Sequence, residues 1–132
     1  MVYWIQRCLH NHSDTLALNM LRVLAGALRH DSRVFIVEQL REDPPSVVRN
    51  VVMDMVLMGF GGKLRTREEW ECMTAKAGLK INSVVGGLGM AKTNPVVSGL
   101  GPLALIECVR DQPVGEPEST VTASSIQEDR GE

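Results

Sequence analysis

Apolar positions in the first 40 residues form two strand-like runs separated by a helical stripe. Residues 2–9 are apolar and rich in aromatic side chains, which predicts a strand. Ser13 and Asp14 can cap a helix start, and leucines then recur at helical spacing as far as residue 28. The β-branched run over 33–38 is typical of a strand buried on both faces, as in a parallel sheet.

The middle of the chain predicts two more helices. Valines and methionines over 47–58 recur at helical spacing after a break at 43–46. Thr66 and Glu69 then match a capping box, in which each side chain bonds to the backbone near the other residue. The expected buried face of this second helix is Trp70, Met73 and Ala77, and Gly78 is expected to end it.

The end of the chain predicts two strands and a tail. Residues 79–85 alternate between apolar and polar side chains, and 103–109 form an apolar run, with a glycine-rich loop over 86–101. Strands that alternate with helices indicate an α/β fold with a doubly wound parallel sheet, and two consecutive final strands most simply form a hairpin. Residues 111–132 lack large apolar side chains, so we expect a disordered tail.

Composition narrows the class of protein without changing this picture. A length of 132 residues suits a single domain, and the net charge of −2, without a basic run, does not favour a nucleic-acid partner. The apolar runs are too short to cross a membrane, and the N-terminus lacks the pattern of a signal peptide. Cys8, Cys72 and Cys108 are widely spaced, which favours a reducing compartment, the cytoplasm, over a disulfide framework or a zinc site.

His10 and Glu38 are the first candidates for chemistry. His10 follows the first predicted strand and Glu38 ends the second, and doubly wound sheets place their sites at the carboxyl ends of strands. A histidine held by a carboxylate can act as a general base with a fixed tautomer. The alternative is that both residues are structural and do not touch.

Two other motifs are weaker. Residues 86–93 resemble a phosphate-binding loop, but Ala91 replaces its second glycine and no helix pattern follows. His10 and His12 could form a metal pair, yet no third ligand lies near them in the sequence. We therefore predict neither a nucleotide site nor a metal site.

Several segments together resemble a known family. They are Leu9-His10-Asn11-His12-Ser13-Asp14, the strand 34–38 that ends in glutamate, Asp54-Met55 with Met58, Gly61-Gly62-Lys63-Leu64-Arg65-Thr66, Glu68-Glu69-Trp70, Ala77-Gly78-Leu79 and the final strand Leu105-Ile106-Glu107-Cys108. In this order and spacing they resemble S-adenosylmethionine-dependent O-methyltransferases of the plant phenolic and fungal polyketide type.

The resemblance implies a fold, an activity and a set of roles. The fold would be a partial Rossmann-like doubly wound sheet with helices on its faces and a C-terminal hairpin. His10 would be the base that deprotonates an acceptor hydroxyl, and Glu38 would hold its ring. Gln6 and Arg7 would contact S-adenosylmethionine.

The same resemblance places the methyl acceptor, an aromatic or polyketide metabolite, against one predicted helix. The residues concerned are Asp54, Met55 and Met58. The thioethers of the two methionines suit flat aromatic rings, although methionines on an apolar helix equally often fill the core.

Departures from the family pattern accompany the resemblance. Asn11 and His12 replace an aspartate and a tryptophan, and Leu64 replaces an acidic residue that is a second partner of the histidine. Leucine can neither accept a hydrogen bond nor stabilise an imidazolium. The family's glycine-rich cofactor loop would precede Met1, so we expect residues 1–110 to be the C-terminal part of a truncated catalytic domain.

Three hypotheses follow from these observations. The chain is an O-methyltransferase of secondary metabolism; or it is a catalytically silent relative that binds a small molecule, a full-length methyltransferase or a second copy of itself; or it is a small α/β binding protein to which the resemblance is irrelevant. The unpaired sheet edge expected beside the first strand motivates the second hypothesis.

Overall fold

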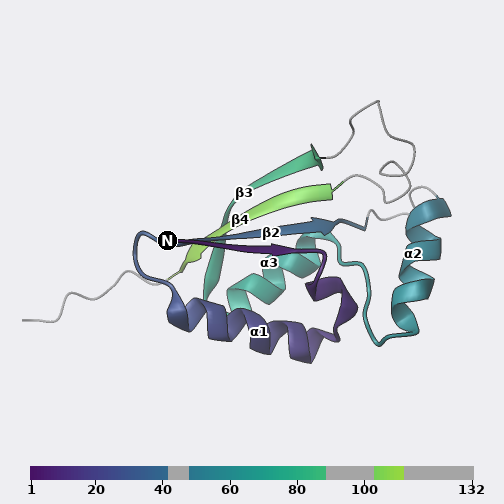
Figure 1. Ribbon diagram of the computed structural model, residues 1–132, viewed down its shortest axis with the longest axis horizontal. Coiled ribbons are helices and arrows are strands. Elements are labelled where there is room, and N and C mark those ends of the chain that lie inside the picture. The colour runs from purple at the N-terminus through teal and green to yellow at the C-terminus, as the bar shows by residue number, and fades with distance from the viewer. Residues whose placement is uncertain (42–47, 89–102, 112–132) are drawn as a thin grey trace, which may run out of the picture.

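The computed structural model describes residues 1–41, 48–88 and 103–111 (Figure 1). The helices and strands follow in the predicted order, although the first strand ends early and a 3-10 turn, η1, replaces its end. The elements are β1 (Val2–Gln6), η1 (Leu9–Asn11), α1 (Asp14–Ala27), β2 (Arg33–Gln39), α2 (Val48–Met58), α3 (Arg67–Lys76), β3 (Leu79–Leu88) and β4 (Leu103–Arg110).

The four strands form one sheet in the order β1-β2-β4-β3. β1 and β2 are parallel, and β4 lies antiparallel to both of its neighbours. The predicted hairpin of the last two strands is confirmed, and because a hairpin reverses the chain, the sheet is mixed rather than wholly parallel. β3 also continues to Leu88, three residues beyond its predicted end, through shifts in its pairing with β4.

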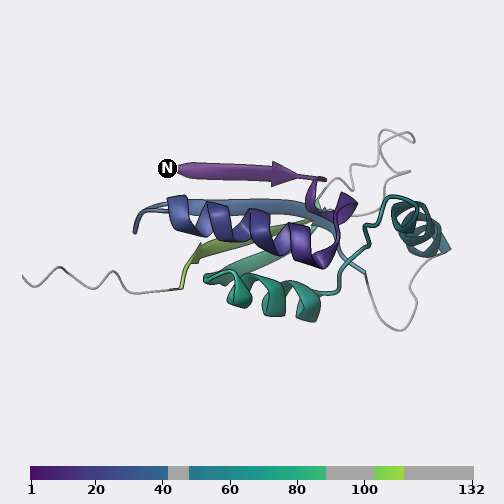
Figure 2. The same cartoon turned by 90° about the horizontal axis from the view of Figure 1, so that it is seen from below.

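Helices α1 and α3 pack side by side on one face of the sheet (Figure 2). Ser13 and Thr66 cap them as predicted, and Thr66 and Glu69 form the complete capping box. The expected buried face of α3 is confirmed. The core consists of side chains from both helices and from every strand (Ala17, Leu21, Ala25, Leu28, Val34, Ile36, Trp70, Met73, Ala77, Leu79, Ile106 and Cys108, with Tyr3 and Ile5 partly buried).

The opposite face of the sheet carries apolar side chains that remain accessible. Trp4 is 58% exposed, and its ring lies 6.1 Å from that of the half-buried Phe35 on the neighbouring strand. Val2 and Val85 are also exposed. The described residues therefore cover one face of the sheet with helices and leave the other largely open.

Helix α2 stands beyond the end of the sheet, at the right of Figure 1. The helix itself is confirmed, but its apolar stripe is exposed, and Leu57 is its one buried apolar side chain among the described residues. Periodicity alone does not supply a surface against which a stripe can pack. The glycine-rich loop beyond Leu88, most of the loop-like motif 86–93 and the tail beyond Asp111 lie outside the described residues.

Two further expectations concern membranes and cysteines. Among the described residues, no helix is long and apolar enough to cross a membrane. The three cysteines are free, and burial raises the pKa of the Cys108 thiol to about 12, with a small contribution from Glu107. A thiol with so high a pKa stays protonated and is a poor nucleophile or metal ligand.

Candidate active site

The ends of β1 and β2 bring the two predicted catalytic residues together. The strands are parallel, and Gln6 pairs with Val37, so the chain leaves β1 directly beside Glu38. The turn η1 then places His10 over that carboxylate, where its Nδ1 contacts Oε2 of Glu38. The pair expected from the sequence is therefore in contact in the structure.

Glu38 is fully buried, and it has a second function at the start of η1. Its Oε1 accepts hydrogen bonds from the backbone N–H groups of Cys8 (3.1 Å), Leu9 (2.9 Å) and His10 (3.4 Å). These groups begin a short helix and have no partner within it. One carboxylate thus fixes both the backbone of η1 and the ring of the histidine.

The contact determines which nitrogen of His10 is available for chemistry. An ionised carboxylate only accepts hydrogen bonds, so Nδ1 must carry the proton that it donates to Glu38. In the neutral ring Nε2 then keeps its lone pair and can accept a proton from a hydroxyl. The side chain is 13% exposed, which leaves it a limited accessible surface.

Arg65 holds the same segment from the other side, and its role was missed in the sequence. Its guanidinium is fully buried and donates to the carbonyl oxygens of Leu9 and His12 and to Oδ1 of Asp14, each at 2.9 Å. It also lies 5.5 Å from the centre of the Trp70 ring. Arg65 is 55 residues from His10 in the sequence, so no local pattern could have revealed these contacts.

The loop that precedes Arg65 fits closely under η1. A Cβ at Gly62 would collide with the carbonyl oxygen of His10, so only glycine fits there without movement of the backbone. The N–H of Lys63 donates to that same oxygen at 3.0 Å. Gly62, the second glycine of the resembling motif, thus has a structural role in positioning the backbone of His10.

Lys63, Asp14 and Glu69 form an ion network beside this loop. Lys63 lies 2.7 Å from Glu69 and 3.2 Å from Asp14. Partial burial raises the pKa of each carboxyl, but hydrogen bonds have the larger, opposite effect and leave both pKa values below normal. At Asp14 these hydrogen bonds come from Arg65 and Lys63. At Glu69 they come from Lys63 and the Thr66 backbone. The hydrogen bond to Glu69 raises the pKa of Lys63.

Gln6 and Arg7, the predicted cofactor contacts, lie where β1 ends. The Gln6 side chain is exposed, and its oxygen accepts from the Trp4 indole at 3.2 Å. Arg7 has a left-handed backbone (φ 50°), which directs the chain from the strand into η1, and its N–H donates to Val37. Neither side chain forms a hydrogen bond or an ion pair with His10.

Asp54, Met55 and Met58, the predicted acceptor residues, lie on α2. Asp54 accepts from the Leu64 N–H at 2.8 Å and lies 3.9 Å from Arg41, so it ties α2 to the following loop. Met55 and Met58 are each 67% exposed and do not fill the core. These methionines lie on α2, beyond the end of the sheet (Figure 1), whereas His10 lies on η1, after β1.

Leu64 and His12 are two positions near the site at which the chain departs from the family pattern. Leu64 is buried, and its side chain offers the histidine no second acceptor. His12 is half-buried, and its backbone carbonyl is held by Arg65. No group of three potential metal ligands occurs among the described residues.

Comparison with known families decides between the broad alternatives. The family model for the O-methyltransferase domain matches residues 2–80, which is more than half of the chain. The chain belongs to this family. This result removes the hypothesis that the resemblance is irrelevant.

Curated relatives occur in fungi and bacteria. O-methyltransferase desB of Aspergillus desertorum is 37% identical over 84 residues, covering 63% of this chain and 20% of that protein. The mitomycin biosynthesis 6-O-methyltransferase of Streptomyces lavendulae is 27% identical over 109 residues, covering 83% and 28%. The chain therefore spans about a fifth to a quarter of the length of such relatives.

Solved structures confirm the predicted Rossmann-like α/β fold. The mitomycin 7-O-methyltransferase MmcR superimposes with a TM-score of 0.68 at 25% identity, covering 83% of this chain and 29% of that protein. LepI in complex with S-adenosylmethionine gives a TM-score of 0.69 at 24% identity, with 83% and 26% covered. The LepI match supports the fold alone.

Proposed function

We propose that this chain supplies the proton-accepting part of an O-methyltransferase site, with residues 1–110 as the relevant portion. The observation that carries this proposal is the contact between His10 and the buried carboxylate of Glu38. The acceptor would be a hydroxyl of an aromatic or polyketide secondary metabolite, and the methyl donor would be S-adenosylmethionine. The three free cysteines are consistent with a cytoplasmic location.

His10 has the features of a general base for this reaction. Nε2 takes the proton of the acceptor hydroxyl, and the oxygen keeps the electron pair with which it attacks a methyl carbon. The negative charge of Glu38 stabilises the imidazolium that forms and prevents rotation of the ring. S-adenosylmethionine would supply that methyl group on a positively charged sulfur. The carbon–sulfur bond would break as the carbon–oxygen bond forms, and its electron pair would stay on the sulfur.

The described residues fit one end of the methyl donor. Within the described part of the chain, the Gln6 amide N–H groups have no hydrogen-bond partner and the Arg7 guanidinium forms no ion pair. Both side chains could therefore bind the carboxylate of the amino-acid portion. Met55 and Met58 would contact the acceptor, and Asp54 would support them by fixing α2 to the next loop.

Transfer of a labelled methyl group tests this proposal. The purified chain is incubated with methyl-labelled S-adenosylmethionine and a panel of phenols, alone and with a full-length family member. We expect labelled ether product, and we expect His10→Ala to lower its rate by about 10²–10⁴. His30→Ala is the matched control, because His30 is exposed. No transfer under either condition, or a His10→Ala variant at full rate, would refute the proposal.

A second candidate is a catalytically silent, partner-binding relative. Leu64, which stands where the family has an acidic partner of the histidine, favours it. In addition, among residues 1–41, 48–88 and 103–111, β1 pairs with a strand on one side only, and an apolar groove of about 550 Å³ beside it is lined in part by Trp4, Met20 and Val23. A strand of a full-length methyltransferase, or of a second copy, could pair with this edge.

Measurement of molecular mass separates the two candidates. Light scattering of the chain, alone and mixed with a full-length methyltransferase, should show a complex if the β1 edge binds a strand. Trp4→Lys should weaken that complex, because it places a charge beside the exposed edge. A monomer mass for the chain alone, together with a mixture that shows only the masses that each protein has by itself, would exclude this candidate.

A further inference from the structure

The two edge strands of the described sheet differ in their protection against a further strand. β3 forms one edge, and it carries Lys80 and two shifts in its pairing with β4, which are features that hinder the addition of a strand. β1 forms the other edge (Figure 1), and its five residues include no charged side chain, no proline and no shift in register. Val2 and Trp4 of this strand are exposed. The β1 edge is therefore suited to accept another strand.

Hydrogen bonds at the two ends of β1 show which of its backbone groups point away from β2. The carbonyl oxygen of Met1 accepts from the N–H of Arg33 at 3.0 Å. The N–H of Arg7 donates to the carbonyl oxygen of Val37 at 2.9 Å. Because successive residues of a strand direct these groups to alternate sides, the odd-numbered residues bond to β2. The residues whose N–H and C=O groups face outward are Val2, Trp4 and Gln6.

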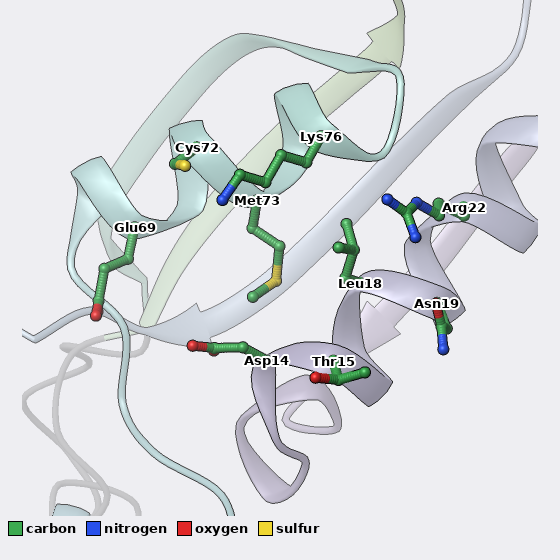
Figure 3. A pocket seen from close by; sticks show the side chains of 9 residues that line it. All are labelled: Asp14, Thr15, Leu18, Asn19, Arg22, Glu69, Cys72, Met73 and Lys76. Atoms are coloured by element: carbon green, nitrogen blue, oxygen red, sulfur yellow. The ribbon is translucent and has the colours of Figure 1, made fainter.

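Helix α1 adds an apolar flank beside the same edge. Leu18 of α1 faces Met73 on the side between α1 and α3 (Figure 3). Met20 and Val23 lie on another flank of the helix, where they line the groove of about 550 Å³ together with Ile5 of β1. A strand added at this edge would thus meet both backbone partners and an apolar surface on the helix side of the sheet.

We infer that a second copy of this chain pairs with the β1 edge, and this inference rests on the partner-binding candidate described above. A two-fold axis normal to the sheet sets the two β1 strands antiparallel. With the axis at Trp4, that residue lies opposite its own copy, and Val2 lies opposite Gln6 of the second copy. Outward groups then face outward groups, and each such pair exchanges two hydrogen bonds. Tyr3 lies opposite Ile5 of the second copy, on the side of the groove.

The chain's own β1 has the properties that this edge requires of a partner. Its helix side carries Tyr3 and Ile5, which are apolar enough to pack against the core, and its open side carries Val2 and Trp4. Pairing therefore buries no charged side chain of the strand. Because five residues span only about 17 Å, the contact is small, and we expect a dimer that dissociates on dilution.

Sedimentation and amide hydrogen exchange, each measured from micromolar to submillimolar concentration, test this dimer. We expect the mass to rise from monomer to dimer. The amide hydrogens of Trp4 and Gln6 should exchange at least tenfold more slowly in the concentrated sample, because only the dimer supplies their acceptors. Amides of β3, the other edge, are the internal control and should not change. An Overhauser contact between the Hα atoms of Tyr3 and Ile5 would identify the register, since within one copy they lie about 7 Å apart.

Charged variants at the two-fold axis separate a second copy from any other partner. Trp4→Lys and Trp4→Glu each place like charges opposite each other, so each should weaken the Kd of the dimer at least tenfold. An equimolar mixture pairs opposite charges and should bind at least threefold more tightly than either variant alone. Val85→Lys adds the same charge at an exposed position of β3 and should leave the Kd within twofold. Circular dichroism should be unchanged throughout, because Trp4 and Val85 are exposed.

The dimer and methyl transfer can fail separately. His10→Ala should dimerise normally, so an inactive chain would not affect this result. A monomer at every concentration, slower exchange confined to β3, equal weakening by Val85→Lys, or a mixture no tighter than either variant would overturn the inference. A chain that is monomeric by itself but binds a full-length methyltransferase would also overturn it, while the partner-binding candidate would stand.

Discussion

Helices α1 and α2 both carry apolar side chains at helical spacing, yet only α1 buries them. Leu21 and Ala17 of α1 are fully buried against the sheet and α3, whereas Val51 and Met55 of α2 remain exposed. The difference does not lie in the periodicity of the two segments. An amphipathic pattern shows which side of a helix can be buried, and a facing apolar surface determines whether it is.

The two faces of the sheet also differ in burial, and the difference is visible between neighbouring residues of one strand. Val34 and Ile36 point to the helices and are fully buried, while Phe35 between them points to the open face and is half-buried. Side chains alternate along every strand, but in the part of the chain that the structure describes one layer of helices covers only one side. Apolar side chains such as Trp4 are therefore exposed on the other side of the described sheet.

The largest expected effect is the loss of a core side chain from α1. Leu21→Ala should lower the free energy of unfolding by about 2–5 kcal/mol, because it leaves a cavity between the helix and the sheet. Leu16→Ala on the same helix is the matched control, since Leu16 is about half-exposed, and should cost less than about 1 kcal/mol. Urea unfolding measures both, and similar losses would contradict the burial contrast.

Removal of the buried guanidinium should have the next largest effect. Arg65→Met removes the guanidinium donor from the carbonyl oxygens of Leu9 and His12, of which Leu9 keeps only the backbone N–H of His12, at an expected cost of about 2–4 kcal/mol. Arg67→Met should change stability by less than about 0.5 kcal/mol, because Arg67 is exposed and pairs only with Glu71. A shift of the His10 ring signals by NMR in the first variant alone would show that Arg65 positions this segment.

A smaller effect concerns pH. The pKa values of Asp14 and Glu69 lie below their ordinary values of 3.8 and 4.5, so the folded state binds fewer protons than the unfolded state as the pH falls. Their stabilising effect is present above those values and is lost as the pH falls through the lowered ones. The pKa of Lys63 is raised, so its stabilising effect has the opposite pH dependence. The effect is present below the ordinary pKa of 10.5 and is lost as the pH rises through the raised value.

The variant Asp14→Asn/Glu69→Gln should therefore show a shallower loss of stability below about pH 4.5. Urea midpoints measured between pH 3 and pH 7 provide the slope. Asp31→Asn/Glu71→Gln removes the same charge from exposed side chains and should leave the slope close to that of the original chain. Equal slopes in the two double variants would exclude the network as the source.

The smallest expected effect is on α2. Met55→Ala should change stability by less than about 0.5 kcal/mol, because the side chain is exposed and alanine favours a helix. Met73→Ala provides the reference in α3, where the same truncation of a buried methionine should cost about 2–5 kcal/mol. A loss above 1 kcal/mol for Met55→Ala would show that α2 packs against a surface outside the described residues.

The sequence by itself determined the local features of this protein. Apolar periodicity located every described α-helix and strand to within a few residues but not the 3-10 turn η1, and the capping residues Ser13 and Thr66 marked two helix starts. It also nominated His10 and Glu38, because parallel strands end at a common edge. These features depend on residues close together in the chain, where spacing and side-chain chemistry are sufficient.

Tertiary structure alone decided which of these features meet. It buried one apolar stripe and exposed another, reversed β4 between β2 and β3, and brought Arg65 to the backbone on both sides of His10. It also placed Met20 and Val23 of α1 beside Ile5 of β1 in a single groove. Contacts between residues tens of positions apart depend on the packing of whole elements, which no local pattern encodes.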